Sequence, residues 1–146
     1  MYSTDWPQGT ETRFQGDRMT ATGTPRSILV VEDEETLRLS VSRTLRKQGF
    51  SVLEAGDGNL AVDLIRDKAG DIGVVLLDLN LPGKSSHEVL EVLRRQRPTA
   101  KVIFTSAYGR ESLDLSLEGL GDESFIRKPY LLSELVGAVQ DALPRH

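Results

Sequence analysis

The sequence contains no cysteine among its 146 residues. Disulfide bonds, zinc sites built on thiolates and cysteine nucleophiles are therefore excluded. It also lacks any apolar run approaching the roughly 18 residues of a membrane span, and no apolar stretch follows the charges near its N-terminus. We therefore expect neither a membrane helix nor a signal peptide, and we expect the protein in the cytoplasm.

An excess of positive charge is also lacking, because the formal net charge is −4 at pH 7. Phosphate backbones demand a basic face, so we do not expect nucleic acid as a direct partner. The content of 38% hydrophobic and 27% charged residues is that of an ordinary globular protein. A chain of this length fits one domain with a short extension, and it buries a core without disulfide or metal support.

Residues 1–26 differ from the rest of the chain. They are rich in Thr, Gly and Pro and show no apolar periodicity. Such a segment buries too little apolar surface to offset its ordering entropy. We therefore expect a flexible tail or linker over residues 1–26 and one domain over residues 27–146. A fusion remnant, or a true start at Met19, would explain the extension equally well.

Short apolar or β-prone runs predict five strands. They are Ser27–Val31, Phe50–Leu53, Ile72–Leu77, Lys101–Thr105 and Ser124–Arg127. The first and third runs show no polar alternation, which is typical of strands covered on both faces.

Apolar residues at helical spacing separate most of these strands. The stripes are Leu37, Val41 and Leu45; Leu60, Ala61, Leu64 and Ile65; Val89, Leu90 and Leu93; and Leu132, Leu135, Val136, Val139 and Leu143. Gly49 stands where a glycine ends a helix, Asp57-Gly58 indicates a turn, and Pro98 stops the third helix. Residues 110–120 alternate as in a strand, but their place between two strands favours a helix.

Strands that alternate with helices predict βαβ units, and hence a parallel sheet with helices on both faces. Right-handed crossovers leave few topologies for five such units. We expect a doubly wound, flavodoxin-like α/β fold with the strand order 2-1-3-4-5. Its switch point lies between the first and third strands, and ligands bind outside the carboxyl ends of these strands.

The predicted strand ends bring polar side chains to this edge of the sheet. They are Glu32, Asp33, Asp78, Thr105, Ser106 and Lys128. Two carboxylates about 4 Å apart repel by roughly 4 kcal/mol at an effective dielectric of about 20, and a hard divalent cation removes that cost. Mg²⁺ prefers few carboxylates together with water and phosphate oxygens. A carboxylate can also act as a nucleophile and form an acyl phosphate, whose charge a metal and a lysine would neutralise.

Four segments resemble the receiver domains of two-component response regulators. They are Ile28–Glu34, Val74–Pro82, Val102–Ala107 and Phe125–Tyr130. The resemblance extends over residues 26–143, and the segments stand in the order and spacing of that family. It implies a phosphoacceptor signalling domain rather than an enzyme, with Mg²⁺ as cofactor and a histidine kinase or histidine phosphotransfer protein as phosphodonor.

The resemblance also implies a role for each residue of the acidic edge. Asp78 matches the phosphoacceptor, Asp33 the direct Mg²⁺ ligand, and Glu32 an acid that acts partly through water. Asn80 matches the position whose backbone carbonyl ligates the metal. Lys128 matches the lysine that pairs with phosphoryl oxygens, and the family has a cis peptide bond directly after that lysine.

Two further residues match the switch of the family. Ser106 matches the hydroxyl that turns toward the phosphoryl group, and we choose it over Thr105 because the family pattern is a hydroxyl followed by Ala, here Ala107. Phe125 matches an aromatic side chain that moves from an exposed to a buried position. The face formed by residues 110–120, the fifth strand and the last helix would then change shape, and partners or a second copy of the domain would dock there.

Two residues depart from the family pattern, and two other functions fit the sequence less well. Ser86 stands where many relatives have Gly, and Asp122 where a small Ala is common. A haloacid-dehalogenase-type phosphatase would need a second Asp at the position of Asn80, and a degenerate receiver used as a scaffold would not need the intact acids. Because the chain ends soon after the last helix, we expect a stand-alone receiver or the C-terminal receiver excised from a hybrid histidine kinase.

Overall fold

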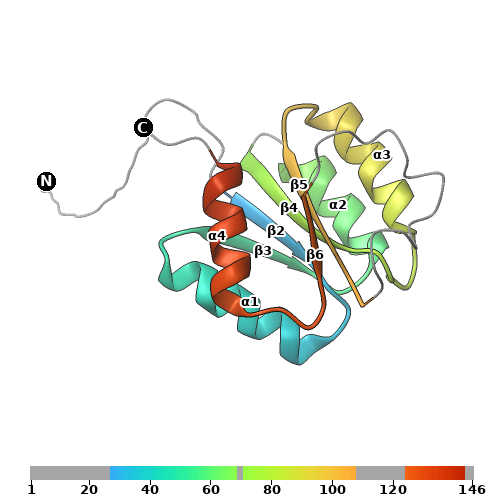
Figure 1. The fold of residues 1–146 in the computed structure, drawn as a ribbon. Coiled ribbons are helices and arrows are strands. Elements are labelled where there is room, and N and C mark those ends of the chain that lie inside the picture. Colours follow the sequence, from blue (N-terminus) through green and yellow to red (C-terminus); the bar gives the residue numbers. More distant parts are fainter. Residues whose placement is uncertain (1–26, 69–70, 108–123, 144–146) are drawn as a thin grey trace, which may run out of the picture.

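The computed structural model describes residues 27–68, 71–107 and 124–143. Strands and helices alternate along the chain (Figure 1). They are β2 (Ser27–Val31), α1 (Glu35–Lys47), β3 (Ser51–Ala55), α2 (Gly58–Lys68), β4 (Ile72–Asp78), α3 (Ser86–Gln96), β5 (Lys101–Ser106), β6 (Ser124–Arg127) and α4 (Leu132–Ala142). The predicted tail over residues 1–26 and the predicted helix over residues 110–120 lie outside the described residues.

The strands form one parallel sheet in the order β3-β2-β4-β5-β6. Counted along the chain, this is the order 2-1-3-4-5, so the predicted doubly wound topology is confirmed. The ends of β2 and β4 are paired through Val31 and Leu77. The switch point therefore lies beside the residues that follow these two positions.

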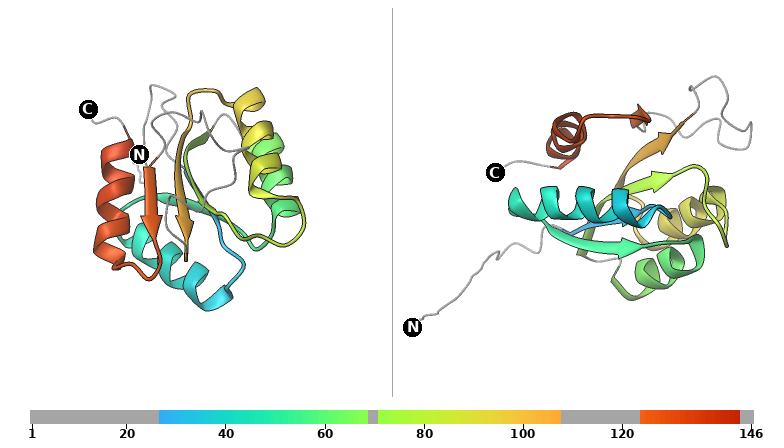
Figure 2. Two further views of the ribbon diagram at one scale, coloured as in Figure 1. Left: turned by 45° about the vertical axis from the view of Figure 1, so that its right-hand side comes forward. Right: turned by 90° about the horizontal axis from the view of Figure 1, so that it is seen from below.

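Each face of the sheet carries its own apolar core, because successive side chains of a strand point to opposite faces. Leu29 and Val75 pack with α2 and α3 on one face. Val30 and Leu76, their neighbours in the sequence, pack with α1 and α4 on the other face. Figures 1 and 2 show the two helical layers on either side of the sheet. The central strands are buried on both faces, which explains why their sequences lack polar alternation.

The ends of the helices follow from local sequence signals. Gly49 has a φ of 97° directly after α1, a conformation that glycine adopts without strain. Ser85 and Glu88 form a reciprocal capping box at the start of α3. The chain bends at Asp57, where a turn was predicted, but Gly58 is already the first residue of α2. The Asp57 side chain accepts a hydrogen bond of 2.8 Å from the Leu60 N–H and so begins this helix.

The helices of the described ranges are amphipathic and short. None of them combines the length and the apolar composition that a crossing of a bilayer needs.

Candidate functional site

The carboxyl ends of the parallel strands bring together residues that are far apart in the sequence. Glu32 and Asp33 follow β2, Asp78 ends β4, and Lys128 follows β6. Oxygen atoms of the three carboxylates lie within 4.8 Å of one another. We call Glu32, Asp33 and Asp78 the acidic site. The predicted convergence of these side chains is therefore present in the structure.

A single ammonium group bridges two of the three acids. The Nζ atom of Lys128 lies 2.7 Å from Oε1 of Glu32 and 3.1 Å from Oδ2 of Asp78. Glu32 is 4% exposed and Asp78 is 2% exposed, so both carboxylates are shielded from water. Charges buried in this way require a partner, and Lys128 supplies it to both.

Glu32 is held by its backbone as well as by its side chain. Its Oε2 atom accepts a hydrogen bond of 3.1 Å from the Glu34 N–H. Its own N–H donates to the Ala55 carbonyl at 3.0 Å. The Arg38 guanidinium of α1 donates to the Glu32 carbonyl at 2.9 Å. These contacts fix the turn between β2 and α1, so the first acid enters the site in one orientation.

Burial is the main influence on the ionisation of Glu32. It raises the pKa of Glu32, and the hydrogen bonds from Lys128 and from the Glu34 N–H offset this effect only in part. For Lys128, burial acts to lower the pKa, but its contacts with Glu32 and Asp78 outweigh burial and raise it. Lys128 is therefore an ammonium ion at neutral pH, and it remains available as a counter-charge.

The switch residues predicted from the sequence lie near this edge. Ser106 ends β5 and is buried, and its carbonyl accepts a hydrogen bond of 2.7 Å from the Lys128 N–H. Thr105 is buried too, and its carbonyl accepts a hydrogen bond of 2.9 Å from the Leu79 N–H. Phe125 lies on β6 opposite Phe104. We expected Phe125 to be exposed, but it is half-buried and packs against the core shared with α2 and α3.

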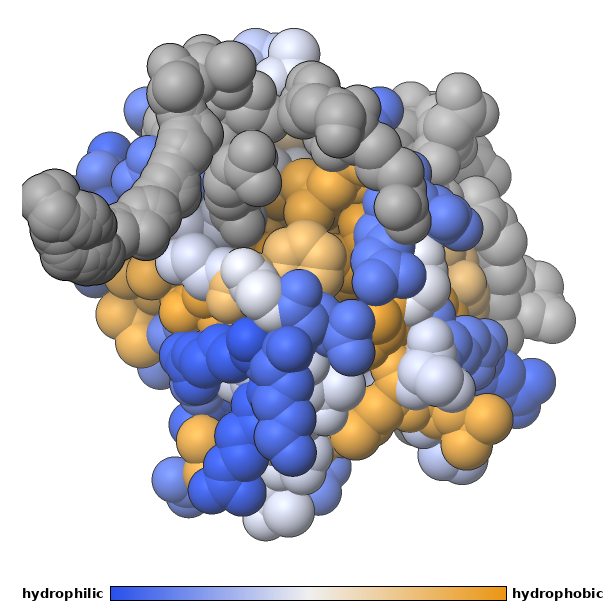
Figure 3. Space-filling view, turned by 90° about the vertical axis from the view of Figure 1, so that its left-hand side faces the viewer, coloured by the Kyte–Doolittle hydropathy of each residue, from blue (hydrophilic) through white to orange (hydrophobic). Residues whose placement is uncertain are grey.

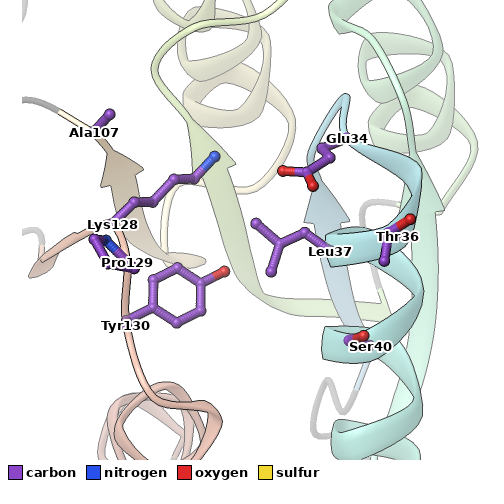
Figure 4. Close-up of a pocket in the computed structure, with 8 residues that line it drawn as sticks. All are labelled: Glu34, Thr36, Leu37, Ser40, Ala107, Lys128, Pro129 and Tyr130. Carbon is purple, nitrogen blue, oxygen red and sulfur yellow. The ribbon is translucent and has the colours of Figure 1, made fainter.

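A pocket of about 500 Å³ opens beside the acidic site, between α1 and the loop that follows β6 (Figure 4). Leu37 and Tyr130 face each other across it, with the Lys128 side chain near its rim. Burial raises the pKa of Tyr130 to about 12, so its hydroxyl stays protonated.

Apolar surface lies between hydrophilic patches on the side of the molecule that carries α1 and α4 (Figure 3). This side of the molecule therefore offers a mixed apolar and hydrophilic surface.

The donor set of the acidic site suits a hard cation. Three carboxylates offer only oxygen ligands, and Asp33 is exposed to incoming water and ligands. Asn80, also exposed, follows Asp78 by two residues, and its N–H donates to Oδ1 of Asp78 at 2.9 Å. The peptide bond after Lys128 is cis, as the resemblance implied. Such an oxygen-rich site with an open side fits Mg²⁺ better than a softer metal.

Two contacts of the site carry no signal in the sequence. Arg38 reaches the Glu32 carbonyl, and the Ser86 hydroxyl donates to the Asp78 carbonyl at 2.6 Å. In both cases the partner is a backbone oxygen, which every residue has. The sequence therefore could show that Ser86 was unusual for the family, but not what it contacts.

Comparison with known proteins identifies the family. A model described as the response regulator receiver domain matches residues 28–140. The chain belongs to this family. The receiver fold and the signalling class predicted from the sequence are thereby confirmed.

Individual relatives include kinases as well as response regulators. The chain is 29% identical over 119 residues to the sensor kinase CckA of Brucella abortus (strain 2308), covering 82% of this chain but 13% of the kinase. The receiver domain of the hybrid histidine kinase CckA is 32% identical, with a TM-score of 0.69 over 81% of this chain and 99% of that one. The response regulator TrrA of Thermotoga maritima, solved in complex with Mg²⁺ and BeF, is 30% identical, with the same TM-score and coverage.

If Asp33 is a direct ligand, as the resemblance implies, replacing it with Ala should weaken Mg²⁺ binding by about ten-fold or more. Asp33 is exposed, so its replacement leaves no cavity in the core. Isothermal titration with Mg²⁺ measures the effect. Glu35→Ala removes the same charge from an exposed position outside the acidic site and is the matched control. Equal affinities in the two variants would contradict the assignment.

Proposed function

We propose that this receiver domain accepts a phosphoryl group on Asp78 and uses the resulting charge to switch a partner-binding face. The observation that carries the proposal is the Lys128 ammonium group, which bridges Glu32 and Asp78 beside the exposed Asp33. A nucleophilic carboxylate can attack only if the negative charge of the incoming phosphoryl group is neutralised. The Lys128 ammonium group, and a cation held by the acids, would neutralise that charge.

In the proposed step, a carboxylate oxygen of Asp78 attacks the phosphorus of the donor. A P–O bond forms to Asp78 as the bond to the leaving group breaks, and the leaving group keeps the electron pair. The Asn80 N–H and the Lys128 ammonium hold one carboxylate oxygen each, so the nucleophile does not rotate. Lys128 is placed to pair with the phosphoryl oxygens once they arrive.

Mg²⁺ would be held by the Asp33 and Asp78 carboxylates and the Asn80 carbonyl, with Glu32 acting through water. When bound, the ion supplies charge neutralisation for the acids and the phosphoryl oxygens. Its ligands in this chain are all oxygen atoms of the kind that Mg²⁺ prefers.

The proposed phosphodonor is a histidine kinase or a histidine phosphotransfer protein. We propose a signalling domain rather than an enzyme that turns over external substrates, because Asn80 replaces the second Asp that a dehalogenase-type phosphatase needs. The likeness to the receiver domain of the hybrid kinase CckA favours a second candidate, the receiver of a hybrid histidine kinase. A tail over residues 1–26, a domain over residues 27–146 and a cytoplasmic location are parts of the same proposal.

Acetyl phosphate should label the protein, with loss of acetate, in the acid-stable and base-labile manner of an acyl phosphate. Asp78→Asn should abolish the label, because the amide is not a nucleophile. Mass spectrometry of the intact protein measures both results. Asp63→Asn alters an exposed acid of α2 and should leave labelling unchanged. Stoichiometric labelling of Asp78→Asn would show that another residue is the acceptor.

The proposed switch couples Asp78 to Phe125 through Ser106. The phosphoryl group adds charge and acceptor oxygens, and the Ser106 hydroxyl turns toward them. Phe125 then packs more deeply into the space that Ser106 leaves, and the face that includes β6 and α4 changes shape. Both states should exist before phosphorylation, with the ligand shifting their populations. Partners, or a second copy of the domain, would dock on this face.

Phe125→Ala should leave labelling of Asp78 nearly intact but remove the change on this face, because the moving side chain is gone. Amide exchange with and without beryllofluoride measures the change over residues 107–130. Leu60→Ala is the control, since Leu60 is 44% exposed and lies on α2, outside this face. If protection in the unmodified protein changes only around the acidic site, the route through Phe125 is wrong.

A further inference from the structure

A side-chain hydrogen bond links the residues on either side of the loop between β4 and α3, residues 79–85. Ser86 is the first residue of α3 and is 5% exposed. Its hydroxyl donates a hydrogen bond of 2.6 Å to the backbone carbonyl of Asp78, the last residue of β4. The two ends of the loop are thus joined by one buried hydrogen bond.

This bond acts on the residue that carries the proposed chemistry. Asp78 is held at three atoms: its carbonyl by Ser86, Oδ1 by the Asn80 N–H at 2.9 Å, and Oδ2 by Lys128 at 3.1 Å. The last two contacts hold the carboxylate, and Ser86 alone among them holds the backbone. Asn80 lies in the closed loop, so the same bond restricts the carbonyl that we assign to the metal.

A second contact holds the loop against the start of α2. The Gly58 N–H donates to the Pro82 carbonyl at 3.1 Å. A Cβ atom added to Gly58 would lie 1.9 Å from the Lys84 carbonyl oxygen, so any other residue here would push the loop away. The loop is therefore fixed in its middle by Gly58 and at its base by Ser86.

We propose that Ser86 is a positioning residue that holds the loop over residues 79–85 in the shape that binds the metal. Gly58 supports this shape, because the loop packs against its backbone. The inference rests on the proposed Mg²⁺ site of Asp33, Asp78 and Asn80. A loop that is ordered before the ion arrives does not lose further conformational freedom on binding, so its affinity is higher. Without the Ser86 hydroxyl, this ordering would accompany metal binding and weaken it.

Ser86→Ala should weaken Mg²⁺ affinity by about five-fold, the equivalent of one ordinary hydrogen bond. It should also speed amide exchange at Leu79 and Asn80 in the metal-free protein. Ser51→Ala is the matched control. Ser51 begins β3 at the opposite end of the sheet, where its hydroxyl accepts a hydrogen bond from the Ser27 hydroxyl, so its loss should leave Mg²⁺ affinity unchanged.

Gly58→Ala provides an independent test that does not remove the hydroxyl. It should weaken Mg²⁺ binding in the same direction, whereas Gly137→Ala should not, because an added Cβ meets nothing within 4 Å in α4. Unchanged Mg²⁺ affinity in both Ser86→Ala and Gly58→Ala would overturn the inference while leaving the metal site intact. A wild-type protein that does not bind Mg²⁺ at all would overturn the proposed function, and the inference with it.

Discussion

Two carboxylates buried side by side need a cation, and the architecture of the site depends on meeting that need. Glu32 and Asp78 are almost fully shielded from water, and the Lys128 ammonium group contacts both. Burying such charges without compensation costs several kcal/mol per ion. Lys128 follows the last strand of the sheet, so the site is balanced only when β2, β4 and β6 are all in place. The chemistry of the site is therefore tied to the completion of the fold.

The same ion pairs bear on the proposed response of the site to a phosphoryl group. Lys128 balances the two buried acids, and its ammonium group would be a counter-charge within reach if a phosphoryl group were added to Asp78. A shift of Lys128 would act on β5 and on the pocket beside α1, because its N–H donates to the Ser106 carbonyl and Lys128 lines this pocket. Local electrostatics at Asp78 thus has a physical connection to the surface formed by β6, α4 and α1.

The fold and most of the site could be predicted from the sequence because they depend on patterns of residue type. The apolar runs at residues 27–31 and 72–77 indicated buried parallel strands, and strand ends in such a sheet share one edge. Three features could not be predicted. The hydrogen bond from Ser86 and the contact at Gly58 both end on backbone atoms, which no pattern of side chains reveals. Phe125 was expected to be exposed, but it is half-buried because β6 pairs with β5 and places Phe125 against a core built from segments distant in the sequence.

The central claim is that Asp78, the other acids and Lys128 form one Mg²⁺-dependent phosphoryl site. A crystal structure of the full chain with Mg²⁺ and beryllofluoride tests it most directly. We expect beryllofluoride on an Asp78 oxygen, an ion bound by Asp33, Asp78 and the Asn80 carbonyl, and the Lys128 ammonium group within about 3 Å of a fluoride. Beryllofluoride bound at another residue, or an empty acidic site at saturating concentrations of both ligands, would contradict the account.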